Sequence, residues 1–489
     1  MTIRSALLYS FTTRYASLVI QFVASVIIAR LLSPTELGIY SVGAAVIMIA
    51  HTFRDFGTSA YVIQESELTE DRLRTAFTLT IMVAWVIAAI LYSASGPLAS
   101  FYDEPGVGEV LRVMSANFAL IPFGSITLAL LRREMNFRSI MFINLASTFV
   151  HSGASILFAV LGLGFISLAW AAVLGTATTV IGALMVNRSW VMAWPSLSER
   201  RHVLGFSVRS SVSSIASEAG HASPDIILGR VLGMEATGMF GRAMGYVQLF
   251  ERLLQDVLRS VMLPYLSDEI RSGSNLRATL NRALENIASV SWFLIGLTAV
   301  LAEPGIRILF GSQWGEAAPI AQVLAVSMAI RCISPSLASG LVANGQIDLL
   351  MKVSVLSVGT KLLLLILLSP YGLFWASVGF SLSEALTLVI MLHTTHRKGM
   401  FTWGDYARVS ARTLPPALVG LVPAVLVVAS DIATDTFLER IALILCAGLS
   451  SLVLWLVVLW LFDIPPKHEL QRLLDKILRR KRVTKAGDL

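Results

Sequence analysis

Apolar stretches of about 20 residues follow one another along almost the whole chain, separated by short polar turns. A helix needs about 20 mostly apolar residues to cross the hydrocarbon core of a bilayer, so each stretch predicts a transmembrane helix. The expected spans lie near residues 6–31, 39–62, 74–96, 107–131, 138–161, 165–187, 205–231, 236–264, 284–309, 317–343, 350–369, 372–396, 410–430 and 440–462. The pattern therefore predicts an all-α polytopic membrane protein with about 14 transmembrane helices.

Composition supports this prediction. Of the 489 residues, 55% are hydrophobic and 14% are charged, and the mean hydropathy is +0.74. Soluble domains contain about 25% charged residues, and no polar connection here is long enough to form a separate catalytic domain. These values exclude a soluble enzyme. The run from Ala16 to Leu32 is followed by no signal-peptidase site, so we expect it to be a retained first helix.

Lysine and arginine gather on alternate connections between the expected spans. Such loops stay in the cytoplasm, and with the N-terminus inside the inner loops hold Arg132, Arg133, Arg138, Arg188, Arg200, Arg201, Arg271, Arg277, Arg282, Arg397, Lys398, Arg408 and Arg412. An even number of spans then places both termini in the cytoplasm. The net charge of +7 thus reports orientation, and we expect no nucleic-acid partner.

The basic tail continues the same trend. Leucine and isoleucine recur at helical spacing between Leu470 and Leu478, and Lys467, Arg472, Lys476 and Arg479 flank them. This spacing predicts an amphipathic helix on an anionic membrane surface, although an orientation signal or a solvated tail also explains the charge.

A long-period repeat predicts two lobes. The first copy is Arg30-Leu31-Leu32-Ser33 and continues to Gly38, and the second is Arg230-Val231-Leu232-Gly233 and continues to Gly238. Both copies lie at the turn between the first and second helices of a six-helix half and share one orientation, which indicates a parallel repeat about an axis along the membrane normal. The expected organisation is an N-terminal lobe (1–203, spans 1–6), a C-terminal lobe (204–400, spans 7–12), two further spans (401–463) and the basic amphipathic tail (464–489).

Polar side chains inside several spans recur at steps of three and four residues, which places them on one face of a helix. Ionisable groups within a span are costly and usually face a polar cavity. We therefore predict a central cleft between the lobes. Its candidate anion-binding residues are Arg14, Arg54, Arg209, Arg242, Arg252 and Arg259, and its candidate sugar-binding residues are Ser17, Gln21 and Gln248. Structural ion pairs and close helix packing explain any one of these residues equally well.

Titratable acids line one face of the seventh span. Glu218, His221 and Asp225 are spaced by three and four residues, so they are candidates for coupling transport to an ion gradient. A static ion pair that holds the lobes together is the alternative. Arg331, Lys361 and Glu384 are expected to be structural.

Several kinds of chemistry have no support in the sequence. It contains no phosphate-binding loop of the Walker type and no zinc, nucleophile-elbow or acidic metal motif. The two cysteines, Cys332 and Cys446, lie in apolar segments, so neither a disulfide framework nor a metal site is expected. We predict neither a catalytic residue nor a cofactor.

Short motifs in a fixed order carry a family resemblance over nearly the whole chain. They are Ile28–Pro34 with Leu37–Tyr40, Asp55–Gly57 running to Val62–Gln64, Phe101–Tyr102 with Glu104–Pro105, Leu131–Arg133 with Phe137, and Leu309–Gly311 with Trp314 and Ala317–Pro319. In these motifs the chain resembles the polysaccharide-export flippases (Wzx type) of the multidrug, oligosaccharidyl-lipid and polysaccharide (MOP) flippase superfamily.

The resemblance implies a two-lobed, MATE-like bundle that alternates between inward and outward openings. The implied substrate is an undecaprenyl-diphosphate-linked oligosaccharide, which crosses the bacterial inner membrane for surface polysaccharide synthesis. A polysaccharide polymerase and a chain-length regulator are the implied partners. An arginine-lined cleft suits this substrate, because the planar guanidinium fork matches phosphate oxygens.

Two alternatives stay open from the sequence. A drug or cation antiporter of the same superfamily would be expected to hold unpaired carboxylates and aromatic rings, and the excess of arginine argues against it. A membrane polysaccharide polymerase or glycosyltransferase would need a larger outer loop than any connection here provides.

Overall fold

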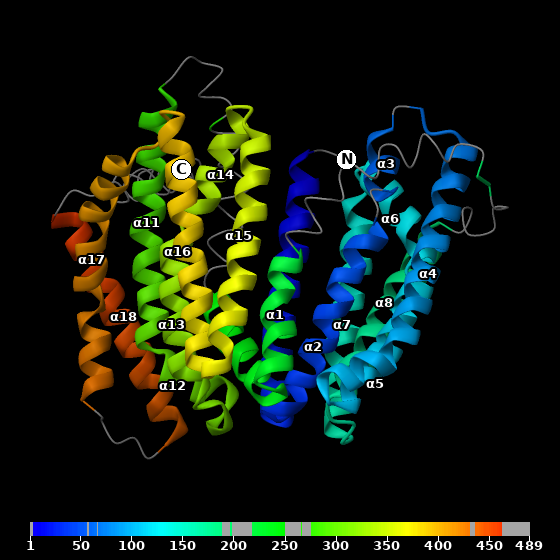
Figure 1. Cartoon of the computed structure of the whole chain (residues 1–489), viewed down its shortest axis with the longest axis horizontal. Coiled ribbons are helices and arrows are strands. Elements are labelled where there is room, and N and C mark those ends of the chain that lie inside the picture. The colour runs from blue at the N-terminus through cyan, green and yellow to red at the C-terminus, as the bar shows by residue number, and fades with distance from the viewer. Residues whose placement is uncertain are drawn as a thin grey trace, which may run out of the picture. The chain divides into compact units, whose positions relative to one another are not determined.

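The structure is a computed structural model that describes residues 3–55, 58–65, 67–187, 196–197, 218–249, 266, 275–430 and 436–461. The chain divides into two compact units, Met1–Gly241 and Arg242–Leu489 (Figure 1). The lobe boundary predicted at 203/204 lies outside the described residues and stays a prediction, as do the other predicted domain limits.

The first unit is a bundle of helices in which sequence neighbours pack side by side. The helix α4 lies against α5, α7 lies against α8, and α1 lies against α7. The helices are α1 (Ile3–Leu31), α2 (Pro34–Asp55), α3 (Thr58–Gln64), α4 (Glu70–Tyr102), α5 (Pro105–Leu120), α6 (Pro122–Arg133), α7 (Phe137–Val160) and α8 (Ile166–Val186). Residues 218–231 and 234–249 are also helical, and the second of these segments runs from the first unit into the second.

Helices of the second unit also pair, with α11 against α17, α15 against α16 and α17 against α18. They are α11 (Leu276–Val300), α12 (Ala302–Phe310), η1 (Ser312–Trp314), α13 (Ala317–Arg331), α14 (Ser334–Ala343), α15 (Ile347–Leu368), η2 (Ser369–Tyr371), α16 (Leu373–Arg397), α17 (Trp403–Ala429) and α18 (Phe437–Leu461). At the α11–α17–α18 junction, the Phe293 and Trp455 rings stack 4.6 Å apart. Gly420 lies against both residues, and a larger side chain at this position would overlap Trp455.

At two prolines the observed helix boundaries differ from those of the expected spans. The expected span 74–96 stops before Pro97, yet α4 continues through Pro97 to Tyr102. It ends where Asp103 adopts a left-handed conformation (φ 54°) and donates its N–H to the carbonyls of Ala99 and Ser100. Conversely, the expected span 107–131 is broken, because α5 and α6 meet at a 52° bend immediately before Pro122. Proline lacks the amide hydrogen that a continuous helix needs, and it favours the first position of a new one.

The predicted all-α membrane architecture is confirmed. Within the described residues, eleven helices are long and apolar enough to cross a bilayer, or twelve if the bent α5–α6 pair counts as one span. The expected spans 205–231 and 236–264 lie partly outside the described residues, so the count of fourteen stays a prediction.

The two copies of the predicted repeat contact each other within the first unit. Gly38 is in the first turns of α2, and Gly238 has the same place in the helix 234–249. A Cβ atom added to Gly38 would overlap the carbonyl oxygen of Met234, and one added to Gly238 would overlap that of Pro34. Because Pro34 and Met234 are equivalent positions of the repeat, the contact is reciprocal. Only glycine lets the two backbones approach this closely. We call this contact the glycine crossing.

Candidate functional site

Three predicted cleft residues lie on α1. The side chains of Arg14 and Gln21 are exposed. Ser17 is half-buried, and its hydroxyl lies 3.4 Å from that of Thr148 on α7. A hydroxyl pair of this kind joins two helices of one unit, so packing explains Ser17 without a ligand.

Arg54 lies in the last turn of α2 beside an aromatic ring stack. Its Nη1 is 3.0 Å from Nδ1 of His51, whose ring stacks on Phe118 of α5 with centroids 4.6 Å apart. The stack fixes the imidazole, and the imidazole in turn orients the guanidinium. Arg54 is therefore a positioned cation, half-buried at the end of a span, and this placement suits an anion ligand.

The predicted coupling residues lie on the helix 218–231. Glu218 and Asp225 are half-buried and His221 is exposed. This helix is tied to α4, because the Tyr102 hydroxyl donates to the carbonyl of Ile226 at 3.4 Å and Arg230 pairs with Asp103 at 2.9 Å. The coupling role stays a prediction.

Arg242 is buried among aromatic rings of the second unit. Its guanidinium carbon lies 4.6 Å from the ring centroid of Phe310 and 5.0 Å from that of Trp314. The next turn of the helix is anchored by Tyr246, whose hydroxyl donates to the carbonyl of Leu301 at 3.0 Å. A cation over aromatic faces is stabilised by the ring quadrupoles, which accounts for Arg242 by packing alone. Its predicted role as a phosphate ligand stays a prediction.

The remaining predicted residues are only partly described. Gln248 is half-buried near the end of the helix 234–249. Arg209, Arg252 and Arg259 lie outside the described residues. The predicted cleft between the lobes therefore stays a prediction.

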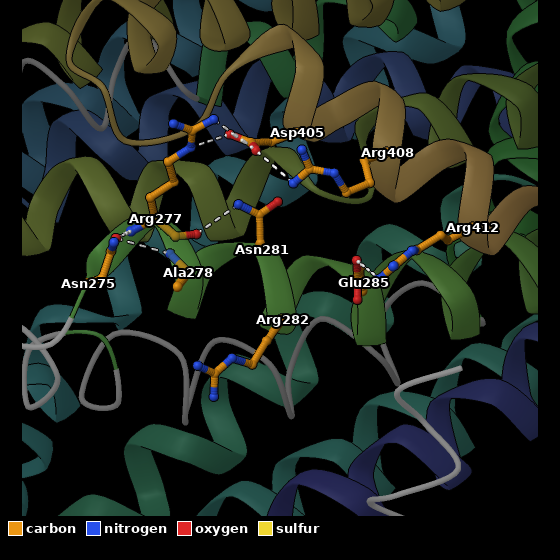
Figure 2. A pocket seen from close by; sticks show the side chains of 9 residues that line it. All are labelled: Asn275, Arg277, Ala278, Asn281, Arg282, Glu285, Asp405, Arg408 and Arg412. Atoms are coloured by element: carbon orange, nitrogen blue, oxygen red, sulfur yellow. Dashed lines mark hydrogen bonds and ion pairs between the residues drawn. The ribbon is translucent and has the colours of Figure 1, made fainter. Parts of the chain in front are cut away.

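A second cationic site, which we call the arginine pocket, lies where α11 and α17 begin (Figure 2). Its cavity has a volume of about 530 Å³ and is lined by Asn275, Arg277, Ala278, Asn281, Arg282, Glu285, Asp405, Arg408 and Arg412. The described lining residues include four arginines and two carboxylates, which together carry a formal charge of +2.

Buried carboxylates hold the arginines of the pocket in place. Asp405 is 1% exposed, and its carboxylate accepts hydrogen bonds from Nε (2.7 Å) and Nη2 (3.1 Å) of Arg277. It also closes the capping box of α17 with Thr402. Glu285 is buried as well, and it pairs with Arg412 at 3.4 Å. These ion pairs hold the arginines in place. The arginines still outnumber the carboxylates among the described lining residues, so a positive charge remains.

From the sequence alone, these arginines were interpreted only as signals of membrane orientation. The available signal was the spacing: Arg277, Asn281 and Glu285 share one face of α11, and Asp405, Arg408 and Arg412 share one face of α17. Nothing in the sequence paired the two helices, since they are far apart along the chain.

The three residues expected to be structural do meet. Lys361 Nζ lies 2.8 Å from the carboxylate of Glu384, with Arg331 4.0 Å from the same oxygen. Lys361 also lies 4.7 Å from the ring centroid of Phe380. Glu384 is buried in α16, so the group is an ion-pair network inside the bundle.

Comparison with known proteins places this architecture in context. A family model described as a polysaccharide biosynthesis protein matches residues 27–319. The succinoglycan biosynthesis transport protein ExoT of Rhizobium meliloti is 29% identical over 317 residues, which is 64% of this chain and 63% of that protein. The lipopolysaccharide biosynthesis protein WzxC of Escherichia coli is 22% identical over 336 residues, or 67% of each chain. The match thus spans less than two thirds of the Rhizobium protein.

Solved structures share the fold over a larger part of the chain. The lipid II flippase MurJ, in an inward closed conformation, superposes with a TM-score of 0.71 at 14% identity and covers 93% of this chain and 99% of its own. An inward-facing MATE family multidrug transporter of the MOP superfamily superposes with a TM-score of 0.64 at 13% identity, covering 83% of this chain and 98% of its own. At these identities the likeness shows the fold alone.

Proposed function

We infer a function from the premise that the chain belongs to the polysaccharide biosynthesis protein family. We propose that it is a flippase that moves lipid-linked oligosaccharide units across a membrane for surface polysaccharide synthesis. The observation that carries this proposal is the family match over residues 27–319 in a chain built as a multi-pass bundle of apolar helices. The names of the relatives, a succinoglycan transport protein and a lipopolysaccharide biosynthesis protein, point the same way.

The physical requirement of this function is a path for an anionic headgroup. A lipid diphosphate is strongly hydrated, so it can cross only where cationic donors replace its water. Among the described residues, Arg54 best meets the requirement for a cationic donor, because its guanidinium is positioned by His51. Arg14, Arg209, Arg242, Arg252 and Arg259 are the further proposed contacts, with Ser17, Gln21 and Gln248 toward the sugars.

A drug antiporter is the nearest competing function. The fold does not separate the two, because the chain superposes on both a flippase and a multidrug transporter. The family match favours polysaccharide synthesis. A membrane polymerase or glycosyltransferase is the more distant alternative.

The finer proposal concerns substrate, cycle and location. We propose undecaprenyl diphosphate as the lipid carrier, alternating access as the cycle, and the bacterial inner membrane as the location. The protein would deliver its product to a polymerase under a chain-length regulator.

Glu218, His221 and Asp225 are the proposed coupling groups. Transport into vesicles with an imposed proton or sodium gradient would test them, and transport that does not respond to either gradient would refute coupling.

The test of the function is a deletion strain that expresses the native chain or Arg54→Ala. The deletion is expected to trap lipid-linked oligosaccharide in the cytoplasmic leaflet, and the native chain to release it. Arg54→Ala should lower the export rate about tenfold or more, because a charge-assisted hydrogen bond contributes about 1.5–3 kcal/mol. Radiolabelled glycan recovered in each leaflet is the measurement.

The matched control for Arg54→Ala is Arg132→Ala, which removes an exposed arginine of α6. It should export like the native chain. A deletion strain with normal export but increased drug sensitivity would instead favour the antiporter. If the deletion strain accumulates no untranslocated lipid-linked oligosaccharide, the flippase proposal is refuted.

The proposed orientation has its own test. A reporter fused after Leu489 should be active only in a cytoplasmic format, and one inserted near Asp103 only in a periplasmic format, because the basic loops are expected inside. Paired fluorescent-protein and alkaline phosphatase fusions measure this. Reversal at either site would contradict the proposed topology.

A further inference from the structure

The arginine pocket of the second unit is unused by the proposed transport path, and its chemistry points to a ligand of its own. We propose that it binds the phosphate group of an anionic membrane lipid at the cytoplasmic surface, as a stationary site beside α17. The proposal needs neither transport nor a particular glycan.

The pocket is built to present cationic donors. Asp405 and Glu285 are buried and fix Arg277 and Arg412 from within. Arg408 and Arg412 have side chains 60% and 62% exposed, and each reaches its carboxylate through one nitrogen at 3.5 Å and 3.4 Å, respectively. A guanidinium has five N–H donors. Most donors of these two arginines are thus available to a ligand.

Arg282 adds a cation with no carboxylate of its own. Among the residues that the structure describes, no ion pair or hydrogen bond involves its exposed guanidinium, and it belongs to the pocket lining. Among the described lining residues, two carboxylates against four arginines leave an excess of +2 around a cavity of about 530 Å³. This volume lies within the range of ligand sites, roughly 300–1,000 Å³, and the charge excess matches a phosphate group.

The surface next to the pocket favours a lipid over a soluble phosphate. Continuing along α17, the face that presents Arg408 and Arg412 becomes apolar at Val419, Val422 and Leu426, all of which are exposed. A ligand with a phosphate head and hydrocarbon chains matches both parts of this face. Such cationic clusters at the ends of spans attract anionic headgroups.

The depth of the site is consistent with a headgroup. The arginine pocket lies at the first turns of α11 and α17, which are 25 and 27 residues long. At 1.5 Å per residue such helices exceed the roughly 30 Å hydrocarbon core, so their ends reach the level of the lipid phosphates. In the proposed orientation these ends face the cytoplasm.

The test is retention of lipid by the purified full-length chain. Native mass spectrometry would measure binding of phosphatidylglycerol and of phosphatidylcholine from mixed micelles, with and without inorganic phosphate. The native chain is expected to retain phosphatidylglycerol selectively. The double variant Arg282→Gln, Arg408→Gln should weaken that retention about tenfold or more, since it removes charge-assisted contacts. It leaves Asp405 paired with Arg277, so folding should be unaffected.

A control with the same change in charge is the double variant Arg132→Gln, Arg397→Gln, in which both arginines are exposed and lie outside the pocket lining. It should bind lipid like the native chain. Equal retention of the two lipids by the native chain, or equal losses in both double variants, would overturn the proposal. Displacement of phosphatidylglycerol by millimolar inorganic phosphate would overturn the lipid source and point to a soluble anion. Binding is read without transport, so this result is independent of the flippase test.

Discussion

Gly38→Ala is expected to abolish the proposed export activity and to lower the melting temperature of the purified protein. The added methyl group would overlap the backbone carbonyl of Met234, and a backbone atom cannot rotate away as the end of a side chain can. The helices α2 and 234–249 must therefore separate. Overpacking typically costs about 1–3 kcal/mol, and a rigid obstacle puts this variant at or above the upper end. Export in the deletion strain and thermal melting in detergent measure the two effects.

The reciprocal geometry gives a sharper form of the same test. Gly238→Ala should match Gly38→Ala, and the double variant should be only slightly worse than either, because the first substitution already opens the shared contact. Gly245→Ala, on the same helix as Gly238, is the control. Among the described residues, no atom beyond the chain neighbours and the backbone of its own helix lies within 4 Å of a Cβ added there, so this variant should be neutral or slightly stabilising. Additive losses in the double variant would show that the two glycines act separately.

Glu384→Ala is expected to lower the free energy of unfolding by about 3–5 kcal/mol, because removing one partner of a buried ion pair strands the other charge. Lys361 lies 2.8 Å from the Glu384 carboxylate and is largely buried between apolar helices. Thermal unfolding monitored by size-exclusion chromatography would measure the loss. The double variant Lys361→Met, Glu384→Leu should regain most of it, since no charge of that pair is then left alone.

An exposed ion pair provides the comparison for Glu384. Glu303 pairs with Arg307 one turn along α12, with both side chains more than half exposed. Glu303→Ala should therefore cost no more than about 0.3–0.5 kcal/mol. If Glu384→Ala unfolds as the native chain does, the buried network contributes nothing to stability.

Helix periodicity was sufficient to predict the fold class, because bilayer thickness fixes the length of each apolar stretch. It was insufficient at prolines. The expected span 74–96 ends before Pro97 and the expected span 107–131 runs through Pro122. The structure shows the reverse, because α4 continues through Pro97 and a new helix begins at Pro122. Helical spacing alone does not distinguish these two outcomes.

The site was less predictable than the fold for a related reason. From the sequence, Arg242 was expected near a polar stripe of its span, yet it packs on Phe310 and Trp314, which belong to a distant segment. The arginine pocket needed the same kind of information, since its carboxylates come from both α11 and α17. Spacing identifies which residues share a face, and only the tertiary structure identifies what that face meets.

The glycine crossing has a consequence for how such a chain could originate. In a symmetric homodimer, an isologous interface pairs residue i with residue j and residue j with residue i. Gly38 with Met234 and Gly238 with Pro34 follow this rule within one chain. A dimer of identical ancestral halves would have made both contacts from a single glycine codon. After gene duplication and fusion each contact depends on its own codon, so a substitution in one half can no longer be matched automatically by the other.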